Sequence, residues 1–247
     1  MSLPVRPNSV IPKATFLIPL DAGECISQAC QELIAPLTLL QGYTEWLSSG
    51  LVAPENGFSR CLPVMERSIA RLTRVIEDMR CLAKISSDRV LPSVTSLLNI
   101  KALVEKVVEQ SATLAYGHGV VFKTDTIGTD IVINGDFFLW DYCLTTFLEL
   151  LLAAGSGRSS VISITSEESP GCQVIQISDN IGEISAEDYR RLESGLLTIQ
   201  GLLGREVNCT GLSLRTARLA LLSQKAYLEL RSIPGASTTI IVRAPIV

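Results

Sequence analysis

Few side chains in this 247-residue sequence are suited to nucleophilic or metal-based chemistry. The one histidine, His118, lies in a Tyr-Gly-His-Gly stretch that is typical of a surface loop. The seven cysteines are scattered, and none forms a CxxC pair: Cys25, Cys30, Cys61, Cys81, Cys143, Cys172 and Cys209. Because most of them fall in apolar segments, we expect small buried side chains in a reducing compartment, without disulfides or a metal site.

The composition is that of a folded protein with an ample core. Hydrophobic residues make up 47% of the chain, and the formal net charge of −4 gives no attraction to nucleic-acid phosphates or anionic lipids. No apolar run reaches the roughly 20 residues of a membrane span, and the first 20 residues lack the features of a signal peptide. We expect a cytoplasmic protein with an ill-ordered arm at residues 1–20, and with neither nucleic acid nor membrane as a partner.

Two long amphipathic helices are predicted within residues 21–87. In the first, from Asp21 to about Ser48, apolar side chains recur every three or four residues, at Ile26, Cys30, Leu33, Leu37, Leu40 and Leu47. In the second, steps of three and four alternate over three heptads, at Leu62, Met65, Ile69, Leu72, Ile76, Met79 and Ala83. Charged residues lie off this second stripe, at Glu66, Arg67, Arg71, Arg74, Glu77 and Arg80.

The connection between these helices, residues 49–59, contains Gly50, Pro54, Asn56 and Gly57 and therefore predicts an antiparallel hairpin. A hairpin cannot bury its own apolar stripe. Two copies would bury both stripes in a four-helix bundle, which predicts a homodimer through residues 21–87. The alternative is that the hairpin packs on the downstream domain.

Residues 88–247 show a mixed pattern of strands and helices that predicts a second domain of the α+β class. Strand patterns occur near Val90 and at 120–123, 130–133, 161–166, 172–178, 226–232 and 238–243. Helical patterns occur at about 100–115, 138–154, 186–194 and 212–224, and a Gly-rich stretch covers 195–211. This order favours an α/β sandwich, a mixed sheet with helices on one face.

The run from Ser27 to Leu47 resembles the phospho-acceptor helix of sensor histidine kinases, whose motif reads His-Glu-Leu-Arg-Thr-Pro-Leu-Thr. The matching residues are Glu32, Leu33, Pro36, Leu37, Thr38, Gly42 and Tyr43. At the phospho-acceptor position, however, the chain has Gln31. The second helix, which includes MERSIARLTRVIEDMRCLAKI, is similar to the second hairpin helix of that family.

The later segments resemble the nucleotide-binding boxes of the same family. Gly135-Asp136 resembles the lead-in to the N box, and residues 149–154, Glu-Leu-Leu-Leu-Ala-Ala, stand where the family has Asn-Leu-Leu-x-Asn-Ala. Residues 177–184 are similar to the first glycine box, and residues 209–214 to the second, in which Gly211 alone survives of three glycines. The resemblance covers about residues 22–245. It implies a dimerising hairpin followed by an ATPase-like sandwich of the GHKL type, as in histidine phosphotransferases of that architecture.

On the hairpin, the departures from the family pattern remove the chemistry that the resemblance would imply. The carboxamide of Gln31 has no useful pKa and is a poor nucleophile. Glu32, which in the family holds the imidazole proton, is left as a solvated acid. Ala35 stands where the family has a polar residue for phosphatase activity, and Thr38 lies nearly a full turn too far along to replace it.

The nucleotide site is altered in the same way, so we expect no cofactor. Ala153 replaces the asparagine that binds the metal and offers no oxygen to Mg²⁺. Ile181 and Glu183 occupy two glycine positions of the first box and would obstruct the approach of the phosphates. Asp179 remains as the adenine-reading group, although a carboxylate that caps a turn is an equal interpretation.

The other residual cleft positions are Gly182 and Gly211. Glu149 could be a general base only beside a metal site and a glycine loop that bind a nucleotide. Because both are altered, we interpret Glu149 as a structural residue.

These features predict a pseudokinase, a dimeric scaffold without enzymatic activity that docks a response regulator, a kinase or another signalling protein. The expected docking residues are Gln31, Glu32, Ile34, Ala35 and Thr38. The alternatives are a divergent ATP-binding kinase with another acceptor, a phosphotransfer protein, and a small-molecule sensor in the vacated cleft. Tight binding of Mg-ATP would favour the kinase.

Overall fold

The structure is a computed structural model that describes residues 22–49, 54–88, 96–128, 132–204, 207 and 209–246. The expected N-terminal arm at residues 1–20 and the expected strand near Val90 lie outside these ranges.

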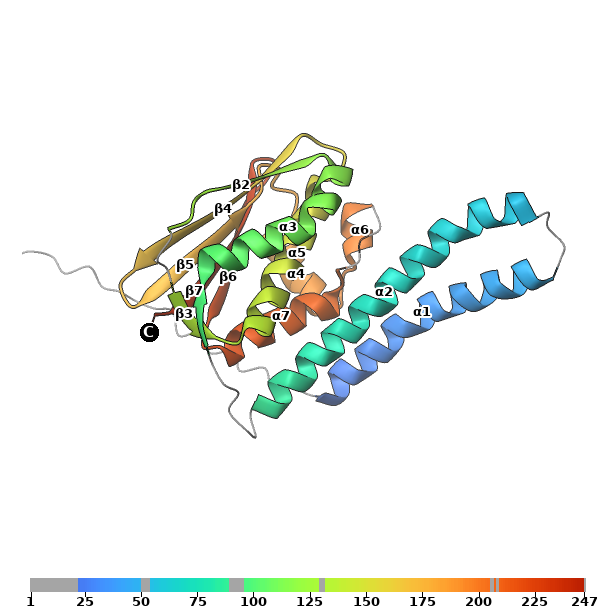
Figure 1. Ribbon diagram of the computed structural model, residues 1–247, viewed down its shortest axis with the longest axis horizontal. Coiled ribbons are helices and arrows are strands. Elements are labelled where there is room, and N and C mark those ends of the chain that lie inside the picture. The colour runs from blue at the N-terminus through green and yellow to red at the C-terminus, as the bar shows by residue number, and fades with distance from the viewer. Residues whose placement is uncertain are drawn as a thin grey trace, which may run out of the picture.

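The described chain begins with the predicted helical hairpin. Helix α1 spans Ala22–Ser48 and helix α2 spans Pro54–Asp88, and the two lie side by side along one edge of the molecule (Figure 1). The predicted connection at residues 49–59 was too long, because α2 already begins at Pro54. Proline suits the first position of a helix because its missing N–H would have no intrahelical partner there.

The remaining elements form the predicted sandwich. The main sheet has the order β2 (Val120–Thr126), β4 (Ser160–Ser169), β5 (Cys172–Ser178), β7 (Ser237–Pro245) and β6 (Tyr227–Ile233). Strand β2 pairs parallel with β4, and all other pairs in this sheet are antiparallel. A second, two-stranded sheet joins β1 (Ser96–Asn99) to β3 (Val132–Gly135).

The long helices of the sandwich cover one face of the main sheet, as the sequence predicted. They are α3 (Ile100–His118), α4 (Phe137–Gly155) and α7 (Gly211–Ser223), while the short helices α5 (Ala186–Glu193) and α6 (Ile199–Leu203) lie between β5 and α7 in the chain. Helices α4 and α7 lie between the sheet and α2 (Figure 1). The hairpin is therefore positioned by the helical layer of the sandwich.

Helix α4 is the centre of the core. Within the part of the chain that the structure describes, α4 alone is long and apolar enough to span a bilayer by length and composition, and 72% of its most apolar window is buried inside the protein. This helix was predicted from the sequence at about residues 138–154, but not as an uninterrupted apolar run, because Asp141 and Glu149 lie within it. Its side chains pack against the sheet, α3 and α7.

Two further expectations required correction. His118 lies in the last turn of α3 and not in a loop, because Gly119 ends the helix in the left-handed region at a φ of 70°. The Gly-rich stretch contains α6, which is capped by the Thr198 side chain, an acceptor for the Gly201 N–H. Of the seven cysteines, all of which are free, Cys30 is exposed and Cys172 is partly exposed, and the others are buried as expected.

The hairpin has two apolar faces with different surroundings. One face packs on α7, where Leu212 lies in a buried cluster with Cys25, Ala29, Val75 and Leu82. The predicted stripe is largely on the other face, and eight of its members are exposed: Ile26, Cys30, Leu37, Leu62, Ile69, Ile76, Met79 and Ala83. The hairpin therefore packs on the downstream domain through one face and still leaves an exposed apolar stripe on the other.

Candidate functional site

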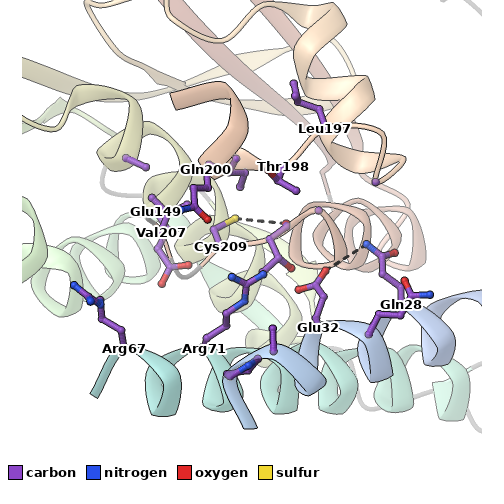
Figure 2. Close-up of a pocket in the computed structure, with 18 of the residues that line it drawn as sticks. Gln28, Glu32, Arg67, Arg71, Glu149, Leu197, Thr198, Gln200, Val207 and Cys209 are labelled. Carbon is purple, nitrogen blue, oxygen red and sulfur yellow. Dashed lines mark hydrogen bonds between the residues drawn. The ribbon is translucent and has the colours of Figure 1, made fainter. Parts of the chain in front are cut away.

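A cavity of about 730 Å³ lies between the hairpin and the ATPase-like sandwich. Helices α1 and α2 form one wall, and α4, the segment around α6 and the start of α7 form the opposite wall (Figure 2). The polar lining includes Gln28, Gln31, Glu32, Arg67, Arg71, Glu149, Thr198, Gln200 and Thr210. Such a volume falls within the range of ordinary small-molecule pockets.

Gln31 and Ala35 lie one turn apart on the α1 wall of this cavity. Ala153 of α4 also lines the cavity. The position that corresponds to a phospho-acceptor and the position that corresponds to a metal ligand thus line the same cavity. A carboxamide and two methyl groups, however, supply neither a nucleophile nor an oxygen ligand for Mg²⁺.

The inner part of the α1 and α2 wall carries one acid and one guanidinium with unused hydrogen-bonding capacity. Glu32 Oε1 accepts a hydrogen bond from Gln28 Nε2 at 3.4 Å (Figure 2). Among the described residues, Glu32 Oε2 and Arg71 Nε are buried without a hydrogen-bond partner. Glu32 is therefore not the fully solvated acid that the sequence analysis expected.

Glu149, the first residue of the N-box segment, is held by the hairpin. Its Oε2 lies 3.2 Å from Nη1 of Arg74, which comes from α2. Burial raises the pKa of Glu149, and Arg74 partly offsets that rise. The arginine takes up the negative charge of the carboxylate, which supports the structural interpretation of Glu149.

Asp179 lies at the end of β5 and caps the turn that follows. Its Oδ1 accepts hydrogen bonds from the backbone N–H groups of Ile181 and Gly182, both at 2.9 Å, and of Thr238 at 2.8 Å. Its Oδ2 is buried and has no hydrogen-bond partner among the described residues. The carboxylate thus caps a turn, one of the two roles expected from the sequence, and its second oxygen is left for the other, a contact with adenine.

The glycines of the residual cleft have packing roles in this structure. Gly182 has a φ of 67°, and a Cβ there would lie 2.3 Å from the backbone oxygen of Ile233. A Cβ on Gly211 would lie 2.4 Å from the oxygen of Leu192. Gly211 lines the cavity, whereas Asp179 and Gly182 do not. The structure therefore separates the residual adenine position from the cavity beside Gln31.

The obstructing residues are accommodated by local contacts. Glu183 forms an ion pair with Arg158 at 3.3 Å. Thr210 caps α7: its side chain accepts a hydrogen bond from the Ser213 backbone N–H, and the Ser213 side chain accepts one from the Thr210 backbone N–H. These residues do not fit a Mg²⁺-nucleotide. Ala153 offers no oxygen ligand to the metal, and the carboxylate of Glu183 stands at a glycine position of the phosphate loop.

The five predicted docking residues divide between two surfaces. Ile34 is 62% exposed, and Thr38 is exposed beside it, with its hydroxyl group donating to the Ile34 carbonyl oxygen. Gln31, Glu32 and Ala35 line the cavity instead. A partner that reaches all five must therefore contact the mouth of the cavity as well as the outer face of α1.

The role of Arg74 was not predicted from the sequence, where it was noted only as one of the charges off the apolar stripe of the second helix. Arg74 is only 4% exposed and lies against the sandwich. The signal that would have found it is the spacing of Arg74 and Asp78, four residues apart on one helix face, since such a pair is well placed to interact. Their ion pair measures 3.3 Å.

Comparisons with known proteins agree with this architecture, although no protein family model matches the chain. The sensor protein SrrB of Staphylococcus aureus strain N315 is 22% identical over 229 residues, which cover 89% of this chain and 37% of SrrB. The chain thus spans little more than a third of the length of the curated relatives that it matches.

Solved structures give the same result for the fold. The Acinetobacter baumannii histidine kinase AdeS superposes with a TM-score of 0.66 at 19% identity, covering 87% of this chain and 97% of that chain. The histidine kinase ThkA, solved in complex with the response regulator protein TrrA, gives 0.59 at 15% identity, covering 91% and 62%. With its hairpin, sandwich and degenerate boxes in the same order, the chain has the fold of a sensor histidine kinase core, and it is similar in sequence to sensor kinases over most of its length.

Proposed function

We propose that this chain is a catalytically inactive, histidine-kinase-like signalling protein, a dimeric scaffold that docks a response regulator or another regulatory protein. The observation that carries the proposal is that Gln31 and Ala153 line the same cavity. The fold brings these two positions to one space, yet neither residue has the chemistry that phosphoryl transfer requires. The same proposal places the protein in the cytoplasm, beside soluble receiver proteins.

Incubation with radiolabelled ATP and Mg²⁺ tests the loss of activity. We expect no label on the wild-type chain, because it lacks the acceptor imidazole. We also expect none on Gln31→His alone, because Ala153 still provides no metal ligand. A double variant, Gln31→His with Ala153→Asn, is the matched comparison that restores both groups. Robust labelling of the wild-type chain would refute the proposal.

Docking is supported by the exposed residues of α1. Ile34 and Thr38 present an apolar and a hydroxyl group to solvent, beside the mouth of the cavity. The similar kinase ThkA was solved with a response regulator protein. Calorimetric titration with purified receiver domains is the direct test, and Ile34→Asp should weaken any binding at least tenfold because it places a charge in the contact. Leu97→Asp, on β1, is the control for surface charge.

The second candidate is a divergent ATP-binding kinase or phosphotransfer protein. It is favoured by Asp179, whose Oδ2 is buried with no partner among the described residues and so retains the capacity to accept a hydrogen bond from an adenine amino group. A fluorescent ATP analogue separates the candidates. Absence of binding at millimolar concentration agrees with the scaffold. Micromolar binding that is lost in Asp179→Asn would favour the kinase.

A further inference from the structure

One hairpin side chain, Arg74, joins α2 to two helices of the sandwich. Its Nη1 lies 3.2 Å from Glu149 Oε2, and its Nη2 donates to Thr146 Oγ1, both on α4. Its Nε donates to Ser213 Oγ of α7 at 3.2 Å, and the guanidinium lies 5.0 Å from the centre of the Tyr142 ring. A single arginine thus uses all three of its nitrogens in contacts with the downstream domain.

The carboxylate of Asp78 completes this network from one turn further along α2. Asp78 is fully buried, and its Oδ1 lies 3.3 Å from Arg74 Nε. The Tyr142 hydroxyl donates to Oδ1 at 2.6 Å, and the Ser213 hydroxyl donates to Oδ2 at 2.8 Å. Both carboxylate oxygens of Asp78 therefore have donors from the sandwich. The network contains one cation, the buried carboxylate of Asp78 and the partly buried carboxylate of Glu149, with the more exposed Glu77 3.9 Å from Arg74.

Contacts of other kinds extend the network along α2. Lys84 forms an ion pair at 3.0 Å with Asp136, the residue that caps the start of α4. Arg80 lies over the ring of Phe138 at 5.6 Å. Cys81 and Ile85 belong to the main hydrophobic core of the sandwich. From Arg74 to Ile85, one face of this helix is therefore part of the sandwich core.

Separation of the two parts would break the ion pair of Arg74 with Glu149 and the hydrogen bonds that link Arg74 and Asp78 to Thr146, Ser213 and Tyr142. Water would take up the freed polar groups, so the larger cost is the exposure of the apolar surface around Cys81 and Ile85. Interfaces between mobile domains are usually small and more polar, whereas this one combines apolar burial with ion pairs and hydrogen bonds across the joint. The energetic penalty opposes any rotation of the hairpin against the sandwich.

We infer that the Arg74 network fuses the hairpin and the ATPase-like sandwich into one cooperative unit, whose relative orientation is fixed without a bound nucleotide. This inference does not depend on the proposed function.

Differential scanning calorimetry of the full chain is the first test. The wild-type protein should unfold in one transition with equal calorimetric and van't Hoff enthalpies. Arg74→Met should lower the transition temperature by about 10 °C, because the buried Asp78 and the partly buried Glu149 lose their positively charged partner. Arg60→Met, an exposed arginine on the same helix, is the control and should leave the temperature unchanged. Two separate wild-type transitions, or an unshifted Arg74→Met, would overturn the inference.

Amide hydrogen exchange of the same proteins reports on the joint itself. In the wild-type chain, α2 residues 74–85 and α4 residues 142–149 should exchange through the same global opening. In Arg74→Met, the α2 peptide should exchange at least tenfold faster than the α4 peptide. If Arg74→Met does not fold, Glu149→Gln takes its place and should show the same difference to a smaller extent. Equal protection of both peptides in the folded variant would overturn the inference.

X-ray scattering with and without millimolar Mg-ATP tests the orientation. We expect superimposable curves for the wild-type chain. A nucleotide-dependent change in the radius of gyration would overturn a fixed joint.

Discussion

Asp78 makes the stability of this protein depend on pH in an unusual direction. Burial raises its pKa to about 6 from an ordinary value of 3.8, although Arg74 opposes the rise. The folded state therefore binds a proton more tightly than the unfolded chain does. Its contribution to stability is complete below about pH 4 and is lost as the pH rises to 6 and above.

The free energy of unfolding should accordingly fall between pH 5 and pH 7.5, and this group contributes on the order of 2 kcal/mol to the fall. Urea denaturation at the two pH values measures it. Asp78→Asn should remove that part of the difference, since the amide does not titrate. An identical pH dependence in the wild-type and variant proteins would show that Asp78 does not titrate as we expect.

Gly182 should tolerate no side chain. Gly182→Ala should destabilise the protein by about 3 kcal/mol, because it combines a positive φ with a clash against the backbone of the β6–β7 turn. Gly171→Ala is the matched control: its φ is 79°, but the added Cβ meets open space, so about 1 kcal/mol is expected. Chemical denaturation measures the free energy of unfolding of both variants. Equal losses of stability in the two variants would contradict the argument.

At the scale of single residues, a missing chemical group can be identified in the sequence, whereas the role of a group that is present depends on its partners in the fold. Gln31 and Ala153 could be interpreted directly, because a side chain without the required atoms cannot supply them. Arg74 could not, because a charge off an apolar stripe is usually solvated. Its burial depends on acceptors in α4 and α7, far along the chain, that only the folded structure brings near.

At the scale of elements, the exposed stripe of the hairpin leads to a prediction about assembly. Ile69 and Ile76 lie seven residues apart on α2 and are both 54% exposed. If two chains bury this stripe in a four-helix bundle, Ile69→Asp with Ile76→Asp should convert the dimer to a monomer. Sedimentation velocity measures the change, with Leu97→Asp as the control. A wild-type chain that sediments as a monomer at micromolar concentration would argue against the dimer.

Helices and strands were predicted well where periodicity was long and poorly where glycine interrupted it. The stripes of α1 and α2 and the β4–β5 hairpin were recognisable from alternation alone. The start of α2, the end of α3 and the whole of α6 were missed. In each case a glycine or proline suggested a loop, while capping groups such as Thr198 kept the backbone helical.

At the scale of the whole molecule, the structure predicts that the sandwich depends on the hairpin. A fragment of residues 96–247 lacks α2 and so removes Cys81 and Ile85 from the main core. We expect it to bind a hydrophobic dye and to lose a cooperative thermal transition. Residues 60–247, which retain the α2 contacts, are the comparison and should unfold cooperatively. A well-folded 96–247 fragment would contradict this dependence.

The burial of α4 also constrains how the protein is made. This helix is apolar enough to resemble a membrane span, yet the strands and the helix that cover it, β4 to β7 and α7, are synthesised after it. Of its neighbours, α2 and α3 precede it on the ribosome. Helix α2 of the hairpin can therefore pack on the nascent α4 before β4 to β7 and α7 have been synthesised. This contact shortens the time during which α4 is exposed to aggregation or to capture by a targeting factor.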